Sequence, residues 1–120
     1  MINIGIYPTN ADTVIDNFSE WKNVRVIVAR VPATLEKIHS HCIAYLHLDM
    51  NCAPPEVAAI SYLWSRLVSG AVVLLDDYAY FGYRQQKLAM DAFAETKQVK
   101  ILALPTGQGL LVKPPTLNAS

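Results

Sequence analysis

The chain has 120 residues, the usual size of one domain, and its 52% hydrophobic and 17% charged residues argue against disorder, so we expect a single domain over residues 1–120. Its ten basic and ten acidic side chains balance without forming a basic stripe, which excludes the charge pattern of a nucleic-acid-binding or membrane-surface protein. No apolar run approaches the roughly 20 residues of a membrane span and the first residues lack the features of a signal peptide, so we expect a cytoplasmic protein.

The first third of the sequence predicts a helix, a strand and a crossover. Residues 11–21 place Val14, Ile15 and Phe18 at helical spacing, as the inward face of a helix. Residues 23–29 form a β-branched run that ends before Pro32, which is typical of a strand. Residues 30–42 then form a crossover with a short helix, long enough to connect two parallel strands.

Two apolar segments flank the clearest helical pattern. Residues 43–48 predict a buried strand that ends at Asp49. Residues 54–69 predict a helix with prolines at its start and Gly70 at its exit. Residues 71–75 lack alternation, which is typical of a strand buried under helices on both faces. The apolar positions at helical spacing are Val57, Ile60, Leu63, Trp64, Leu67 and Val68.

The last third predicts a helix and a hairpin. Residues 81–97 form the helix, with Leu88, Ala92 and Phe93 inward. Residues 99–104 and 109–114 are two short strands close enough to pair as an antiparallel hairpin. Strands that alternate with helices predict an α/β sandwich, with a mainly parallel sheet of about five strands and this C-terminal hairpin at its edge.

Three aspartates follow the ends of two predicted strands. Because the carboxyl ends of neighbouring parallel strands lie at one edge of a sheet, we expect Asp49, Asp76 and Asp77, here called the acidic cluster, to converge. Like charges so close resist joint ionisation unless a cation or hydrogen-bond donors compensate. Three carboxylates suit Mg²⁺ or Ca²⁺ better than zinc. The alternative is that Asp76 caps the following turn while Asp49 and Asp77 are solvated.

Some other polar residues have simpler interpretations than a functional site. We expect the three histidines to be hydrogen-bonded or solvated rather than metal ligands. Two cysteines are too few for a zinc motif or a disulfide framework, so both are expected to be reduced and buried. Lys113 is assigned no role beyond solubility, and Arg30 is expected to be a solvated surface group. The histidines are His39, His41 and His47, and the cysteines are Cys42 and Cys52.

The segments around the acidic cluster resemble one enzyme family. YLHLDMN, LWSRLVSGAVVLLDDYAYFG and LPTGQGLLVKP are similar to segments in the C-terminal portion of the macrocin-type sugar O-methyltransferases. Those are Rossmann-like, S-adenosylmethionine-dependent enzymes that use a divalent metal. The resemblance implies that the acidic cluster binds the metal, for which Mg²⁺ is the candidate. It also places Asn51 where many members have an aspartate as general base, although a carboxamide cannot accept a proton at neutral pH.

The resemblance further implies a substrate-side loop after the acidic cluster. Tyr78, Tyr80 and Tyr83, together with Phe81, fall in the loop that borders the acceptor site in that family. These aromatic side chains then stack on a sugar or aromatic substrate. Packing as core and lid is the alternative.

The part of the family that binds S-adenosylmethionine has no counterpart in this sequence. Family members use a glycine-rich loop after the first strand, but the only glycine before Gly70 is Gly5, and Gly107 and Gly109 precede a strand rather than a helix. We therefore expect a truncated methyltransferase-like domain that does not transfer methyl groups alone. The strand at residues 23–29 then pairs directly with the strand at 43–48, or a second copy covers the open edge in a homodimer. The alternative function is a non-catalytic homodimeric binding or scaffold module that keeps the acidic cluster for a cation or small molecule.

Overall fold

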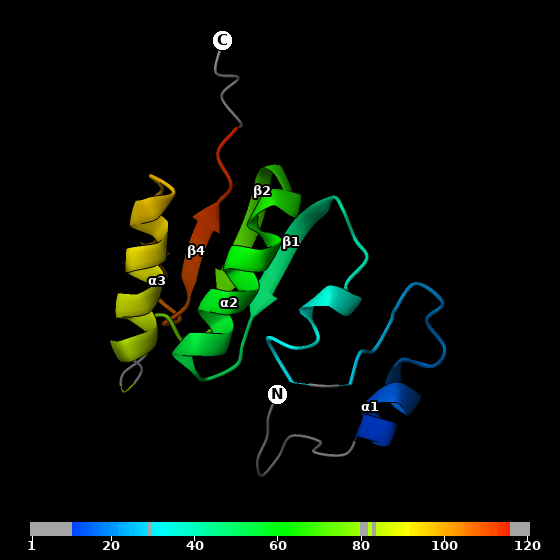
Figure 1. Ribbon diagram of the computed structural model, residues 1–120. Helices are drawn as coiled ribbons and strands as arrows, with labels where there is room; N and C mark the ends of the chain where they lie inside the picture. Colours follow the sequence, from blue (N-terminus) through cyan, green and yellow to red (C-terminus); the bar gives the residue numbers. More distant parts are fainter. Residues whose placement is uncertain (1–10, 29, 80–81, 83, 116–120) are drawn as a thin grey trace. The chain divides into compact units, whose positions relative to one another are not determined.

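The computed structural model describes residues 11–28, 30–79, 82 and 84–115. Backbone contacts group the chain into two units, Met1–Ile38 and His39–Ser120. The second unit contains every described strand and two of the helices (Figure 1). The helices are α1 (Ala11–Phe18), α2 (Ala53–Leu63) and α3 (Arg84–Thr96), and the strands are β1 (Ile43–Leu48), β2 (Leu67–Leu75), β3 (Leu102–Ala103) and β4 (Gly109–Val112).

The first unit forms less regular structure than its sequence predicts. Helix α1 ends at Phe18 rather than at residue 21, and none of its residues is buried, so the predicted inward face of Val14, Ile15 and Phe18 is wrong. An eight-residue helix depends on packing for its stability, and α1 packs few of its side chains.

No strand forms in the described part of residues 23–29, and Ala29 lies outside the described residues. The prediction was wrong because β-branched residues favour a strand only where a neighbour supplies hydrogen bonds and packing. The crossover that follows contains only a short 3₁₀ helix, Leu35–Lys37, with Leu35 buried.

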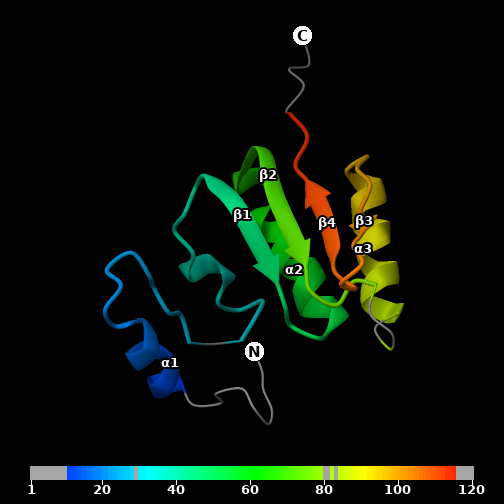
Figure 2. The same cartoon turned by 180° about the vertical axis from the view of Figure 1, so that it is seen from behind.

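The second unit is an α/β structure built on a sheet with strand order β1-β2-β4-β3 (Figure 2). Strands β1 and β2 are parallel, whereas the β2–β4 and β3–β4 pairings are antiparallel. The C-terminal hairpin and the bounds of β1 are as predicted. The described sheet has four strands and one parallel pairing, where we expected about five mainly parallel strands, because residues 23–29 contribute none.

Helix α2 ends earlier than its apolar spacing suggests. The 3₁₀ helix Trp64–Arg66 follows it, and Leu67 and Val68 belong to β2 rather than to the helix. Gly70 therefore lies inside β2, not at a helix exit, and adopts a φ of 83°. The β1–β2 register shifts beside it, between Ile43 and Tyr45, and glycine accommodates such an irregularity without steric cost.

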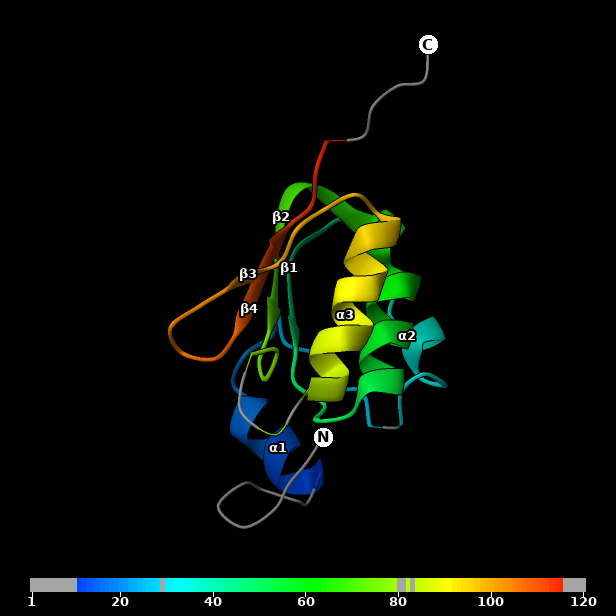
Figure 3. The same cartoon turned by 90° about the vertical axis from the view of Figure 1, so that its left-hand side faces the viewer.

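Helices α2 and α3 lie on one side of the sheet (Figure 3). The sheet residues that face them, including Leu48, Val73 and Leu111, are almost fully buried. On the other face Tyr45, Leu102 and Val112 remain 57%, 60% and 51% exposed, so the prediction that helices cover both faces is wrong within the described residues.

The inner face of α3 differs from the one predicted. Its buried residues are Gln86, Met90, Phe93 and Ala94. Of the predicted inner residues only Phe93 is buried, whereas Leu88 and Ala92 are exposed. Because each residue advances about 100° around a helix, Leu88 lies about 200° from Gln86 and points away from the sheet. None of the helices in the described ranges has the length and apolar character needed to cross a membrane.

Candidate metal site

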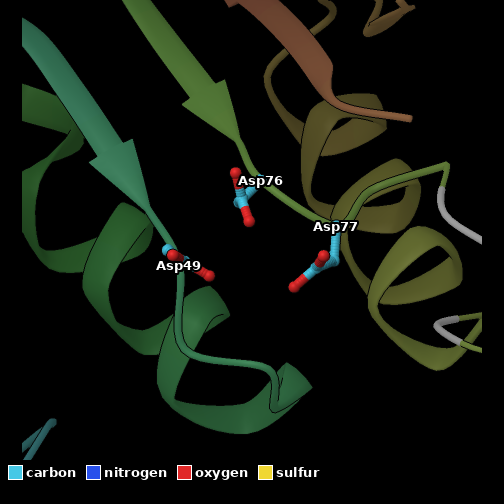
Figure 4. Close-up of side chains that lie close together, drawn as sticks. All are labelled: Asp49, Asp76 and Asp77. Atoms are coloured by element: carbon cyan, nitrogen blue, oxygen red, sulfur yellow. The ribbon is translucent and has the colours of Figure 1, made fainter. Parts of the chain in front are cut away.

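The pairing of β1 with β2 brings the acidic cluster together. Leu48 and Leu75 are partners in the parallel register, so Asp49 and Asp76 follow them at neighbouring strand ends. The N–H of Asp76 donates to the carbonyl of Leu48 at 3.0 Å. One carboxylate oxygen from each aspartate lies within 4.8 Å of the others (Figure 4). The predicted convergence of the three side chains is confirmed.

Two side chains with nitrogen donors lie beside Asp76. Nε2 of Gln108 donates to Oδ1 of Asp76 at 3.1 Å, and Nε2 of His47 lies 3.5 Å from the same oxygen. The hydroxyl of Thr106 donates to Oε1 of Gln108 at 2.9 Å, which orients the amide. No pattern in the sequence singles out Gln108, except that it lies in the segment LPTGQGLLVKP of the family resemblance.

A fourth carboxylate belongs to the same region and was also missed. Glu56, in the first turn of α2, is only 4% exposed. Its Oε2 accepts the N–H of Met50 at 3.0 Å. In the sequence it resembles an ordinary acidic residue near a helix N-terminus, where the helix dipole favours negative charge.

The electrostatics of these carboxylates disfavour their ionised forms. Burial is the main cause that raises the pKa of Asp49. Repulsion from Asp76 and a hydrogen bond with Asp76 raise it further. Burial followed by repulsion from Asp76 and Asp49 raises the pKa of Asp77. Burial also raises the pKa of Glu56, although the Met50 hydrogen bond lowers it. A bound cation would relieve this repulsion, and a set of carboxylate oxygens fits a hard divalent ion such as Mg²⁺ or Ca²⁺.

Asn51 lies in the turn that joins β1 to α2. It is exposed and adopts a φ of 55°, in the left-handed region that asparagine tolerates better than most residues. The requirements of the turn account for an asparagine at this position.

Tyr78 is part of the core, whereas Tyr80, Phe81 and Tyr83 lie outside the described residues. The Tyr78 side chain is buried, and its hydroxyl donates to Oδ1 of Asp91 on α3. Nζ of Lys87 donates to the same hydroxyl at 3.3 Å and to Oδ2 of Asp91 at 2.8 Å. For Tyr78, the structure shows the core packing that was the alternative to substrate contact.

Some expectations for single residues were wrong. Cys42 and Cys52 are unpaired but exposed, not buried. Lys113 is almost fully buried, and its Nζ donates to the carbonyls of Trp64 and Leu67 at 2.7 and 3.1 Å. It therefore stabilises the junction between α2 and β2 and has a role beyond solubility.

The histidines and Arg30 are exposed, and of the histidines His47 is the one beside the acidic cluster.

Comparison with known proteins gives matches among solved structures. Neither a protein-family model nor a curated protein matches the sequence. The structure is similar to that of the O-methyltransferase NovP, with 15% identity and a TM-score of 0.65, over 87% of this chain and 45% of that one. It is also similar to apo CalS11, a TDP-rhamnose 3'-O-methyltransferase in calicheamicin biosynthesis, with 20% identity and a TM-score of 0.56, over 68% of this chain and 36% of that one.

The chain therefore spans less than half the length of either enzyme. At these identities the similarity concerns the fold. The protein has the fold of part of an O-methyltransferase, a truncated Rossmann-like domain.

Proposed function

We propose that this chain is the metal-binding portion of a macrocin-type, S-adenosylmethionine-dependent O-methyltransferase that acts on a sugar hydroxyl. The observation that carries the proposal is the convergence of the acidic cluster at the carboxyl ends of two parallel strands. Ligand sites of open α/β sheets lie at this edge. The fold similarity to a TDP-rhamnose O-methyltransferase supports the sugar acceptor.

The acidic cluster would hold the cation, with Mg²⁺ as the candidate. When bound there, a divalent cation supplies positive charge that polarises an acceptor hydroxyl and favours loss of its proton. Gln108 donates to Oδ1 of Asp76 and would orient this carboxylate toward the cation. Asn51 cannot act as a general base, because its carboxamide does not accept a proton at neutral pH.

Magnesium titration tests the metal site. Mg²⁺ should raise the thermal stability of the wild type, since a ligand at 100 times its Kd stabilises a protein by about 2.7 kcal/mol. The double variant Asp76→Asn with Asp77→Asn should lose this gain, and in EDTA it should unfold at a higher temperature than the wild type because repulsion is relieved. Glu95→Gln, a change at an exposed carboxylate on α3, is the control and should keep the gain. An equal gain of thermal stability with Mg²⁺ in the wild type and the double variant would contradict the proposal.

We also propose that this chain does not transfer methyl groups on its own. Its sequence has no glycine-rich loop between a strand and a helix, which is where such enzymes hold the cofactor with backbone amides. Calorimetry with S-adenosylmethionine, with and without Mg²⁺, should give no binding heat. A saturable heat at either condition would contradict this part of the proposal.

A second candidate function is a non-catalytic homodimeric module. The observation that favours it is the sheet face opposite α2 and α3, where Tyr45, Leu102 and Val112 are all more than half exposed. An exposed apolar face of this kind is typical of an interaction surface, and a two-fold interface brings the same face of two copies together, so the partner we propose is a second copy of the chain. A mass of two chains by light scattering supports this function.

A further inference from the structure

Glu56 carries a buried charge that the proposed metal site does not use directly. It is 4% exposed. Among the residues that the structure describes, Lys113 is the other charged residue that is buried to a similar degree. A carboxylate taken out of water is unfavourable unless hydrogen bonds or charges compensate. Lys113 donates to two carbonyls of the α2–β2 junction, whereas burial raises the pKa of the Glu56 carboxylate and repulsion by the acidic cluster raises it further. An apolar residue of the same size would avoid this cost.

The contact that Glu56 makes acts on the backbone beside Asp49. Its Oε2 accepts the N–H of Met50 at 3.0 Å, and that N–H belongs to the peptide unit that joins Asp49 to Met50. Fixing this peptide plane fixes one of the two backbone torsions of Asp49. The next residue, Asn51, turns the chain from β1 into α2 with a φ of 55°.

The local sequence leaves the Glu56 carboxylate available for this contact. Pro54 and Pro55, in the first turn of α2, have no N–H groups that need a cap, and the side chain of Cys52 at the N-cap makes no capping hydrogen bond. Glu56 therefore reaches back across the turn to Met50 rather than capping its own helix.

We infer that Glu56 is a positioning residue for the cation site: its buried carboxylate holds the Asp49–Met50 peptide so that the side chain of Asp49 meets Asp76 and Asp77. This inference rests on the proposed function. Outer groups that orient metal ligands typically affect metal affinity by about 10- to 100-fold when they are changed. The positioning depends on the hydrogen bond, not on the negative charge of Glu56.

Two substitutions separate the hydrogen bond from the charge. Glu56→Gln keeps an oxygen that can accept the Met50 N–H but removes the charge. Glu56→Met keeps the approximate size and removes both, and as an apolar replacement it does not leave a buried charge unpaired. Glu95→Met, at an exposed position on α3, is the matched control.

The measurements are Mg²⁺ affinity by calorimetry and exchange of the Met50 amide hydrogen by NMR in the metal-free protein. We expect Glu56→Gln to bind Mg²⁺ within about threefold of wild type with a protected amide, and Glu56→Met to bind at least about tenfold more weakly with an unprotected amide. Equal affinity in Glu56→Met and wild type would overturn the inference, as would a loss in Glu56→Gln as large as in Glu56→Met.

Different titration results refute this inference and the proposed function. If the wild type itself gives no Mg²⁺ heat, the metal site is refuted, and the positioning role is refuted with it. If the wild type binds and Glu56→Met binds equally well, only the role of Glu56 is refuted. Thermal unfolding in EDTA confirms that each variant is folded at the temperature of the titration.

Discussion

At the residue scale, Tyr78 and Gly109 hold the end of β2 in place. Tyr78 directly follows Asp77, and its hydroxyl is bound by Asp91 and Lys87 of α3. Its ring lies against Gly109 of β4, where a Cβ atom would come within 2.6 Å of Cγ of Tyr78. The adjacent N–H of Ala79 donates to the carbonyl of Gly107 at 2.8 Å. Tyr78 and Ala79, which directly follow the acidic cluster, are thus held by α3 and by the β3–β4 hairpin together.

Gly109→Ala tests this packing. The added methyl group must displace the Tyr78 ring, so we expect a loss of stability of about 1–3 kcal/mol and, because Tyr78 is bonded to Asp77, weaker Mg²⁺ binding. Urea unfolding and calorimetry measure the two effects.

The control for this substitution is Gly70→Ala. Gly70 has open space around its Cα but a φ of 83°, so alanine there strains the backbone without a clash. It lies inside β2, five residues before the strand ends, and its replacement should lower stability while leaving Mg²⁺ affinity unchanged. If Gly109→Ala likewise leaves the affinity unchanged, Tyr78 does not position the acidic cluster.

At the scale of single elements, sequence patterns predicted the helices and strands that depend on nearby residues. They did not predict where one element ends and the next begins. Strand β1 and most of α2 form where apolar periodicity and the two prolines place them. Leu67 and Val68 also fit the helical spacing, yet they begin β2. Lys113, which lies 46 residues after Leu67, donates through its Nζ to the carbonyls of Leu67 and Trp64 and so stabilises this junction. No pattern within a window of the sequence contains that contact.

The charge of Lys113 is itself affected by this position. Burial, and then repulsion from Lys97, lower the pKa of Lys113, so the unfolded chain binds a proton more readily than the folded one. The cost of burying the ammonium group is present at neutral pH and is relieved as the pH rises through the lowered folded value. The hydrogen bonds to the two carbonyls offset that cost.

The acidic cluster was predictable for a physical reason that does not extend to its supporting residues. The residues that follow two neighbouring parallel strands lie at the same edge of the sheet. The sequence alone therefore predicted that Asp49 and Asp76 lie close together. Glu56 contacts the backbone of Met50 through a turn whose path depends on the left-handed conformation of Asn51. Gln108 reaches Asp76 across 32 residues, from a turn that the hairpin positions. Such contacts depend on tertiary geometry rather than on spacing.

At the scale of the whole molecule, the second unit is a sheet with helices on one side. Parallel strands are usually covered on both faces, and the continuous apolar run of β2 from Ala71 to Leu75 is typical of such a strand. In the structure its inner residues Val73 and Leu75 are buried, whereas Val72 and Leu74 are half-buried on the other face. The sequence of β2 is therefore more apolar than its described surroundings require, and association of two copies would account for the excess.

We expect light scattering at micromolar concentration to give twice the mass of the 13.3 kDa chain. The open face carries Leu102 and Val112 on neighbouring antiparallel strands, so Leu102→Lys with Val112→Lys places two charges on this face and should return the protein to a single-chain mass. Leu88→Lys is the matched control, because Leu88 is 55% exposed but lies on α3 at the covered side of the sheet, and this variant should remain a dimer. Circular dichroism verifies that all three proteins are folded. A single-chain mass for the wild type, or a monomer in the Leu88→Lys control alone, would show that the open sheet face does not mediate association.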